Sequence, residues 1–162
     1  MNTYSIFSKS STVLLLMCSI LLSPASLAAD SAGLSMAELS AWLDAYGDAW
    51  ESRDADKAAN LFAEDSTYQV TPYEDAHTGQ DGVRQYWAGV TAGQRNVVFE
   101  YQALSVTGST GIAHWSASFA VGPDDVHLEL DGIFVLKFDA NGKCTELREW
   151  WHLKSPGAEG NE

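Results

Sequence analysis

Four long, consecutive segments in the second half of the chain alternate apolar and polar residues, and this pattern constrains the fold more than any other feature. The segments lie near 96–107, 111–122, 126–139 and 143–153. A period of two is typical of strands with one buried face. Short turn signals such as Asn141-Gly142 separate the segments. Consecutive strands with short connections predict an antiparallel meander, and long strands twist, so we expect a strongly curved sheet.

Helical spacing replaces this alternation before residue 96. Ser35 and Glu38 have the spacing of a capping box, and the apolar residues that follow recur at intervals of three and four: Met36, Leu39, Leu43, Tyr46 and Trp50. Asp54 is expected to cap a second, shorter helix that runs through Ala63. Residues 80–91 place Val83, Tyr86, Trp87 and Val90 on one face of a third helix.

Residues 66–71 are rich in β-branched and aromatic side chains and stop at Pro72, which predicts a short edge strand between the second and third helices. The predicted fold class is therefore α+β. We expect a cone in which three N-terminal helices pack on a strongly curved, mostly antiparallel sheet and close over its apolar face. The domain is predicted to span 35–153, with loose ends at 29–34 and 154–162.

Residues 1–28 have the features of an export signal. Lys9 supplies a positive charge, 12–22 form a short apolar core, and Ser26-Leu27-Ala28 offers small residues for cleavage. The core is about half the length of a membrane-spanning helix, which needs about 20 apolar residues. We therefore predict a signal peptide cleaved after Ala28 and a periplasmic or secreted protein with no membrane contact after cleavage.

The chain is strongly acidic, with 9 Lys and Arg against 22 Asp and Glu and a formal net charge of −13. Such a surface repels phosphate backbones, so nucleic acid is not an expected partner. Cleavage of the signal leaves Cys144 as the one cysteine, which excludes an internal disulfide in the mature chain. For Cys144 we favour a buried position over a bridge between two chains.

The order of elements resembles the nuclear-transport-factor-2-like superfamily, particularly its SnoaL-like polyketide-cyclase branch. The segments that carry the resemblance are 49–54 (AWESRD), 61–65 (LFAED), Gly79 with Tyr86-Trp87, 131–134 (DGIF), Asn141-Gly142 and 147–151 (LREWW). It covers nearly the whole mature chain and implies the cone fold. The superfamily includes ketosteroid isomerases, epoxide hydrolases, polyketide cyclases, dehydratases and domains that only bind.

Glu149 is the leading candidate for chemistry. Strand alternation places it on the same face as Leu147 and Trp151, where burial would raise its pKa and suit it to acid/base work. In the resemblance, 148–151 looks like the segment in which epoxide hydrolases of this fold hold a catalytic carboxylate. Those enzymes also use an Arg-x-Asp pair on an earlier strand, where this chain has 113–117, AHWSA. The structural alternative for Glu149 is an ion pair with Arg84 or Arg53.

A second candidate base is His114, although the alternation places it on the opposite strand face from Trp115. Aromatic residues are expected either to line an interior pocket as ligand contacts or to pack as core: Tyr46, Trp50, Tyr68, Trp87, Trp115 and Trp151. His77 lies in the loop before the third helix, where it would gate the pocket or face solvent.

No metal or cofactor is expected. His127, Glu129 and Asp131 alternate on one face, a spacing more typical of a charged strand surface than of metal ligands. Phosphate-cradling glycine loops, nucleophile elbows and dinucleotide fingerprints do not occur in the sequence.

Two functions follow from these features and stay open at this point. One is an exported domain that takes a small, largely apolar molecule into its pocket, with cofactor-free acid/base catalysis of the isomerase, cyclase or dehydratase type through Glu149. The other is a module that only binds or forms a homodimer, motivated by aromatic residues such as Trp150 with Tyr101 on the sheet surface.

Overall fold

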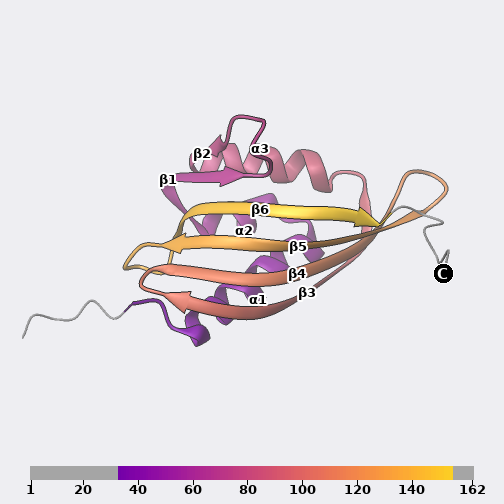
Figure 1. Ribbon diagram of the computed structural model, residues 1–162. Coiled ribbons are helices and arrows are strands. Elements are labelled where there is room, and N and C mark those ends of the chain that lie inside the picture. The colour runs from indigo at the N-terminus through magenta and orange to yellow at the C-terminus, as the bar shows by residue number, and fades with distance from the viewer. Residues whose placement is uncertain (1–32, 155–162) are drawn as a thin grey trace, which may run out of the picture.

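The computed structural model describes residues 33–154. Its elements follow the order α1 (Met36–Ser52), α2 (Ala55–Asn60), β1 (Phe62–Gln69), β2 (His77–Thr78), α3 (Gly79–Thr91), β3 (Gln94–Thr107), β4 (Thr110–Val121), β5 (Val126–Phe138) and β6 (Cys144–Lys154) (Figure 1). The predicted signal peptide, residues 1–28, lies outside the described residues, as do 29–32 and 155–162.

One mostly antiparallel sheet holds the six strands of the described chain in the order β2-β1-β6-β5-β4-β3. The predicted meander is confirmed: β3 to β6 pair with their sequence neighbours in antiparallel fashion, and each begins and ends within two residues of its predicted bounds. The α+β class is confirmed as well. Within residues 33–154, no helix combines the length and apolar character needed to span a membrane.

The predicted edge strand at 66–71 is wrong in both extent and position. The strand β1 starts earlier, at Phe62, and lies between β2 and β6, to which it runs parallel. The second helix accordingly stops at Asn60 rather than Ala63, because the Leu61 carbonyl accepts from the Cys144 N–H at 3.0 Å at the start of the parallel pairing. The edge of the sheet is instead the two-residue strand β2.

Helix α1 begins where its sequence predicts. The Ser35 N–H donates to Glu38 Oε2 at 2.8 Å, and the Glu38 N–H donates to Ser35 Oγ at 3.2 Å, which is the reciprocal capping box. The helix ends at Ser52, and Arg53 is its C-cap: the φ of Arg53 is a left-handed 55°, and its guanidinium donates to the Gln94 carbonyl at 2.9 Å. These contacts fix both ends of the helix that carries Tyr46 and Trp50.

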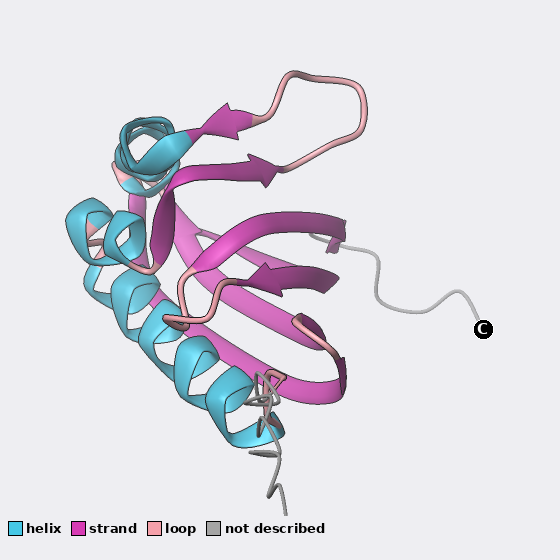
Figure 2. Ribbon diagram, turned by 90° about the vertical axis from the view of Figure 1, so that its left-hand side faces the viewer, coloured by secondary structure: helices cyan, strands magenta, loops and turns pink. Residues whose placement is uncertain are grey.

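The helices lie on one face of the curved sheet (Figure 2). Aromatic side chains form much of the buried layer between them. Tyr46 from α1 contacts Phe99 from β3 and Phe134 from β5, with ring centroids 5.6 and 5.3 Å apart. Gly47 allows this close approach, because a Cβ there would lie 2.8 Å from the Phe99 ring. Most of this apolar face is therefore closed by α1 and α3, and what remains open is the candidate site.

Candidate functional site

Glu149 reaches the interior through the alternation of β6. Leu147 and Glu149 point to the helices and are buried, whereas Arg148 and Trp150 point to the other face and are exposed. The cross-strand partner of Glu149 is Phe134, a fully buried residue. A carboxyl group that is only 5% exposed thus lies in an apolar layer.

A cavity of about 240 Å³ opens beside this carboxyl group. Its lining is mostly aromatic and aliphatic, and comprises Tyr46, Trp50, Tyr68, Tyr86, Trp87, Val90, Gln94, Trp115, Phe119, Leu128, Leu130, Glu149, Trp151 and Leu153. Every aromatic residue that the sequence suggested for ligand contact lines this cavity, together with Glu149. Their position is thereby established, while their roles remain predictions.

Two tyrosine hydroxyl groups connect to the carboxyl group. Tyr46 Oη and Tyr68 Oη share a hydrogen bond of 2.9 Å, and Tyr68 Oη donates to Glu149 Oε1 at a longer 3.4 Å. Burial, together with the neighbouring Glu149 charge, holds the pKa of both phenols well above the ordinary value. Both tyrosines therefore stay protonated at neutral pH and act as hydrogen-bond donors.

Burial raises the pKa of Glu149 to about 8, and the weak hydrogen bond from Tyr68 offsets this only in part. The cavity lining contains no Lys, Arg or His that could neutralise the carboxylate. The ion pair suggested as the structural alternative is not formed. Arg84 contacts Asp56 at 2.6 Å and also Asp81, while Arg53 donates to a backbone carbonyl.

The other polar groups of the lining are mainly donors. Trp50 Nε1 is satisfied by Gln94 Oε1 at 2.8 Å, but Trp87 Nε1 and Trp115 Nε1 are buried and have no acceptor among the described residues. A buried donor without a partner destabilises the empty protein. The site is therefore rich in donors, and the protonated carboxyl group adds one more.

Some lining residues escaped the sequence interpretation. Tyr86 was placed on the inner face of the third helix but not assigned to the pocket; it contacts Tyr68 at 5.1 Å and stacks on His77 at 4.5 Å between ring centroids. Leu128 and Leu130 alternate with His127, Glu129 and Asp131 along β5 and so lie on the opposite face, a pattern from which they could have been assigned to the pocket. Gln94 gave no such signal, because a polar residue at a strand start is ordinarily exposed.

Gly132 makes room for the indole rings of the cavity wall. It pairs with Trp151 across β5 and β6, and a Cβ at this position would lie 2.8 Å from Trp151 Cβ and 2.9 Å from the Trp115 ring. Because this glycine has no side chain, both indoles occupy the inner face of the sheet. The open end of the cavity begins here, at Trp151.

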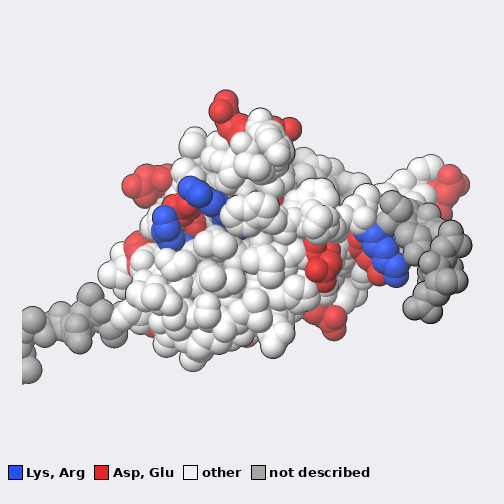
Figure 3. All heavy atoms as spheres, viewed as in Figure 1, with Lys and Arg blue, Asp and Glu red and all other residues white. Residues whose placement is uncertain are grey.

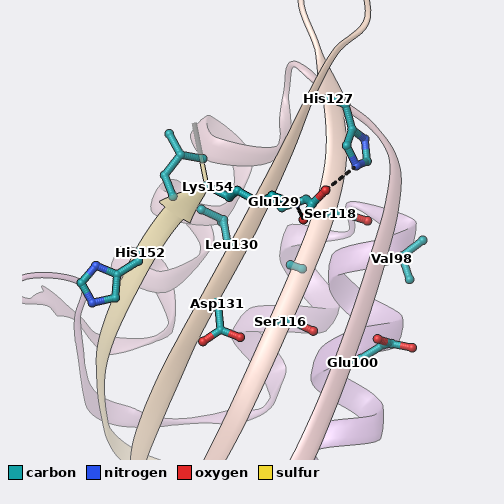
Figure 4. Close-up of a pocket in the computed structure, with 12 residues that line it drawn as sticks. Val98, Glu100, Ser116, Ser118, His127, Glu129, Leu130, Asp131, His152 and Lys154 are labelled. Atoms are coloured by element: carbon teal, nitrogen blue, oxygen red, sulfur yellow. Dashed lines mark hydrogen bonds and ion pairs between the residues drawn. The ribbon is translucent and has the colours of Figure 1, made fainter. Parts of the chain in front are cut away.

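The candidate base His114 lies on the opposite face of the sheet from this cavity. Its Nε2 lies 2.8 Å from Asp131 Oδ2, and both side chains are exposed. The same outer face carries a second, larger hollow of about 560 Å³, lined by residues that include Glu100, Asp131 and His152 (Figure 4). His114 is thus separated from Glu149 by the thickness of the sheet.

Charged groups in this outer hollow pair with one another. His127 lies 3.7 Å from Glu129, which also receives Lys154 Nζ at 3.1 Å (Figure 4). Within residues 33–154, no group of three or more His, Cys, Asp or Glu has an arrangement that could hold a metal ion. In the space-filling view, the charged groups of this face are scattered around a broad uncharged area (Figure 3).

The curved six-stranded sheet, the helices on one of its faces and the cavity between them define a protein of the nuclear-transport-factor-2-like class. The chain belongs to the SnoaL-like domain family, whose sequence pattern matches residues 43–147. Among curated proteins, none matches the sequence.

Solved structures similar to this chain include isomerase-like and cyclase-like proteins. A putative isomerase from Bacillus subtilis has a TM-score of 0.64 at 14% identity, over 74% of this chain and 90% of that one. A putative SnoaL-like polyketide cyclase from Shewanella denitrificans has a TM-score of 0.61 at 15% identity, over 72% and 90%. The epoxide hydrolase/cyclase-like enzyme SalBIII has a TM-score of 0.60 at 17% identity, over 72% and 88%. At these identities the likeness shows the fold alone.

Proposed function

We propose that this protein is an exported SnoaL-like domain that binds a small, largely apolar molecule in its interior cavity and converts it by cofactor-free acid/base chemistry of the isomerase, cyclase or dehydratase type. The observation that carries the proposal is the buried carboxyl group of Glu149, which has no cationic partner and faces an aromatic cavity. Helices and sheet together are proposed to form a cone, with the cavity as its hollow.

Glu149 has the protonation behaviour that such chemistry needs. With its pKa raised to about 8 by burial, the group is mostly protonated at neutral pH and can donate a proton or a hydrogen bond to a ligand oxygen. A pKa close to the working pH also lets the group take the proton back. Tyr68 donates to the ionised form, so the charge that appears when Glu149 loses its proton has one partner in place.

The donors of the cavity suit a ligand that carries a hydrogen-bond acceptor, such as a carbonyl oxygen. A carbonyl group gains negative charge on its oxygen when a neighbouring carbon loses a proton, and donors aimed at that oxygen stabilise the transition state. The ionised form of Glu149 takes that carbon proton. Trp87 and Trp115 also line the cavity, and their buried N–H groups have no acceptor among the described residues. A cavity without Lys or Arg favours a neutral ligand.

Epoxide hydrolysis with paired acidic groups has less support. Ala113, Trp115 and Ala117 are the inward residues of the β4 segment where the resemblance would require an Arg-x-Asp pair, and Glu149 is the one carboxyl group in the cavity lining. Names of similar structures that refer to isomerases and cyclases support the proposed class of reaction without defining it.

The replacement Glu149→Gln tests the proposal. The probes are small neutral ketones: cyclohexanone for binding, followed by tryptophan fluorescence, and 3-cyclohexenone for isomerisation to the conjugated ketone, followed by ultraviolet absorbance. We expect Glu149→Gln to keep cyclohexanone binding and to lower the isomerisation rate by at least about 100-fold. Glu100→Gln, on the outer face, is the matched control. Equal rates in parent and Glu149→Gln would remove this residue from the mechanism.

A second candidate function is a homodimer formed through the outer face of the sheet. Trp150 supports it, because half of its surface is exposed there, on the face that also carries the exposed Val98 and Leu104. Tyr101, expected on the same surface, does not contribute: its hydroxyl turns to α1 and donates to Asp44 Oδ1 at 2.6 Å. Sedimentation of the mature protein tests the dimer, and a monomer at high concentration would contradict it.

A further inference from the structure

The mouth of the cavity is apolar and exposed, in contrast to its closed end. Glu149, Tyr46 and Tyr68 are buried at the closed end. At the open end, Val90 from α3 is 41% exposed, and Trp151 and Leu153 from β6 are 41% and 47% exposed, although all three line the cavity. We call these three residues, together with Leu128 and Leu130 from β5, the rim.

The rim continues the inner face of the sheet outward from Glu149. Along β6 the residues Glu149, Trp151 and Leu153 follow one another in the cavity lining, and Leu153 pairs directly with Leu130 of β5. At this end of the sheet Leu130 and Leu153 also border the outer hollow. At about 3.3 Å per residue, Leu153 lies about 13 Å along the strand from Glu149. Val126, at the start of β5, is a further exposed apolar residue with the same alternation. An apolar track therefore leads from the carboxyl group to the surface.

A ligand confined to the cavity would leave this track in water. At about 30 Å³ for a water-sized group, the cavity of about 240 Å³ holds on the order of eight such groups. Large side chains such as Trp151 and Leu153 gain free energy when something apolar covers them, and contiguous exposed apolar surface marks binding sites.

We propose that the ligand is an elongated amphiphile whose hydrogen-bond-accepting head lies against Glu149 and whose hydrocarbon tail leaves the cavity over the rim. This inference rests on the proposed function and names the substrate class for the same site. Continuity between the cavity and the surface is the argument for this occupant, because all five rim residues line the cavity and three of them are also exposed. The head needs acceptor atoms for the donors of the closed end, and the tail needs none.

Straight-chain methyl ketones test the proposal, because they share one acceptor head and differ only in tail length. Binding is measured by tryptophan fluorescence for the series from 2-butanone to 2-decanone. Each added methylene group that enters apolar surroundings should tighten binding about threefold to fourfold, and the gain should continue after the cavity is full. In Leu153→Ser, 2-decanone should bind about tenfold more weakly while 2-butanone binds as before.

Leu104→Ser is the matched control, since Leu104 has the same 47% exposure as Leu153 but lies on the outer face. Val90→Ser repeats the test on α3. Weaker 2-decanone binding in both Val90→Ser and Leu153→Ser could not be caused by a local defect in β6. Affinity that stops rising by about 2-heptanone, whose size fills the cavity, in parent and variants alike, would show that the ligand has no tail on the rim while leaving the cavity function intact. Failure of every ketone to bind would instead remove the proposed function.

A protein partner at the rim is the remaining outcome. If Leu153→Ser but not Leu104→Ser converts a dimer to a monomer in sedimentation, the rim is an interface between chains and the amphiphile proposal is wrong.

Discussion

Glu146 and Glu149 lie three residues apart on β6 and have opposite surroundings. Glu146 faces the outer side of the sheet, where Lys137 donates to it at 2.7 Å and Arg148 lies 2.7 Å away, and these contacts lower its pKa. Glu149 faces the cavity, where burial raises its pKa to about 8. Strand alternation alone thus creates one carboxylate that stays ionised and one carboxyl group that exchanges a proton near neutral pH.

The same contrast holds for the two faces as a whole. On the outer face, Glu129 and Asp131 have basic neighbours in Lys154 and His114. On the inner face, aromatic rings surround a carboxyl group that none of them neutralises. Paired charges on a surface stabilise a protein slightly. A buried carboxyl group without a cationic partner lowers stability, and groups of this kind are concentrated at functional sites.

The largest effect that sharpens this comparison is the pH dependence of stability in Glu149→Gln. The folded protein binds the Glu149 proton more tightly than the unfolded chain does. The contribution of this proton to the parent's free energy of unfolding is therefore complete below about pH 4.5 and is lost as the pH rises through about 8. Relative to the parent, Glu149→Gln should gain on the order of 5 kcal/mol between these limits.

Urea denaturation at several pH values measures this difference. Glu146→Gln is the control, and because its pKa is lowered in the folded state, any loss of stability in that variant should appear above the unfolded pKa rather than below it. If the free energies of unfolding of Glu149→Gln and the parent differ by the same amount at every pH, the pKa of the Glu149 carboxyl group is not raised by burial.

Gly132→Ala is expected to have the next largest effect. The added methyl group would meet the Trp150 carbonyl oxygen at 2.6 Å and two indole side chains, so we expect destabilisation of about 1–3 kcal/mol and weaker ligand binding. Gly89→Ala in α3 is the control: nothing lies within 4 Å of its Cβ, and alanine suits a helix better than glycine. Thermal unfolding of both variants checks the pair, and equal melting temperatures would contradict the close packing.

Tyr68→Phe should have a smaller effect on stability and should shift the pKa of Glu149. It removes the hydroxyl that bonds Tyr46 and Glu149, which costs about 1 kcal/mol for the lost hydrogen bonding. Since the Tyr68 hydrogen bond lowers the pKa of Glu149, its loss should move the pH dependence of activity to higher pH. Activity profiles of the parent and Tyr68→Phe measure the shift, and an unmoved profile would show that the 3.4 Å contact has no energetic effect.

The smallest effect is expected on the outer face. Trp150→Ser removes a half-exposed side chain, and its change in stability should stay within about 0.5 kcal/mol. Chemical denaturation at neutral pH measures this directly. A loss of several kcal/mol, together with a concentration-dependent melting temperature, would show that the outer face is covered by another chain.

Local sequence patterns predicted much of this structure. The period of two placed β3 to β6 within two residues, and the same alternation put Glu149 and Trp115 inside and His114 outside. Helical spacing put Tyr46 and Trp50 on the buried face of α1. Each of these inferences needs only neighbouring residues and the geometry of one element.

What escaped prediction depends on residues far apart in the chain. The start of β1 at Phe62 is set by pairing with Cys144, and the apolar pair Leu61-Phe62 alone fits a helix end equally well. The contact of Arg84 with Asp56 is of the same kind, because it forms only through the packing of α2 on α3, whereas Asp81 lies three residues before Arg84 on the same helix.

The parallel pairing of β1 with β6 also bears on how the protein folds. Tyr68 meets Glu149 across a sequence separation of 81 residues, and the strand that carries Glu149 is the last element of the described chain. Such distant pairing costs loop-closure entropy and slows folding. During synthesis, the carboxyl group therefore enters its aromatic surroundings only after every other element of the described chain has been made.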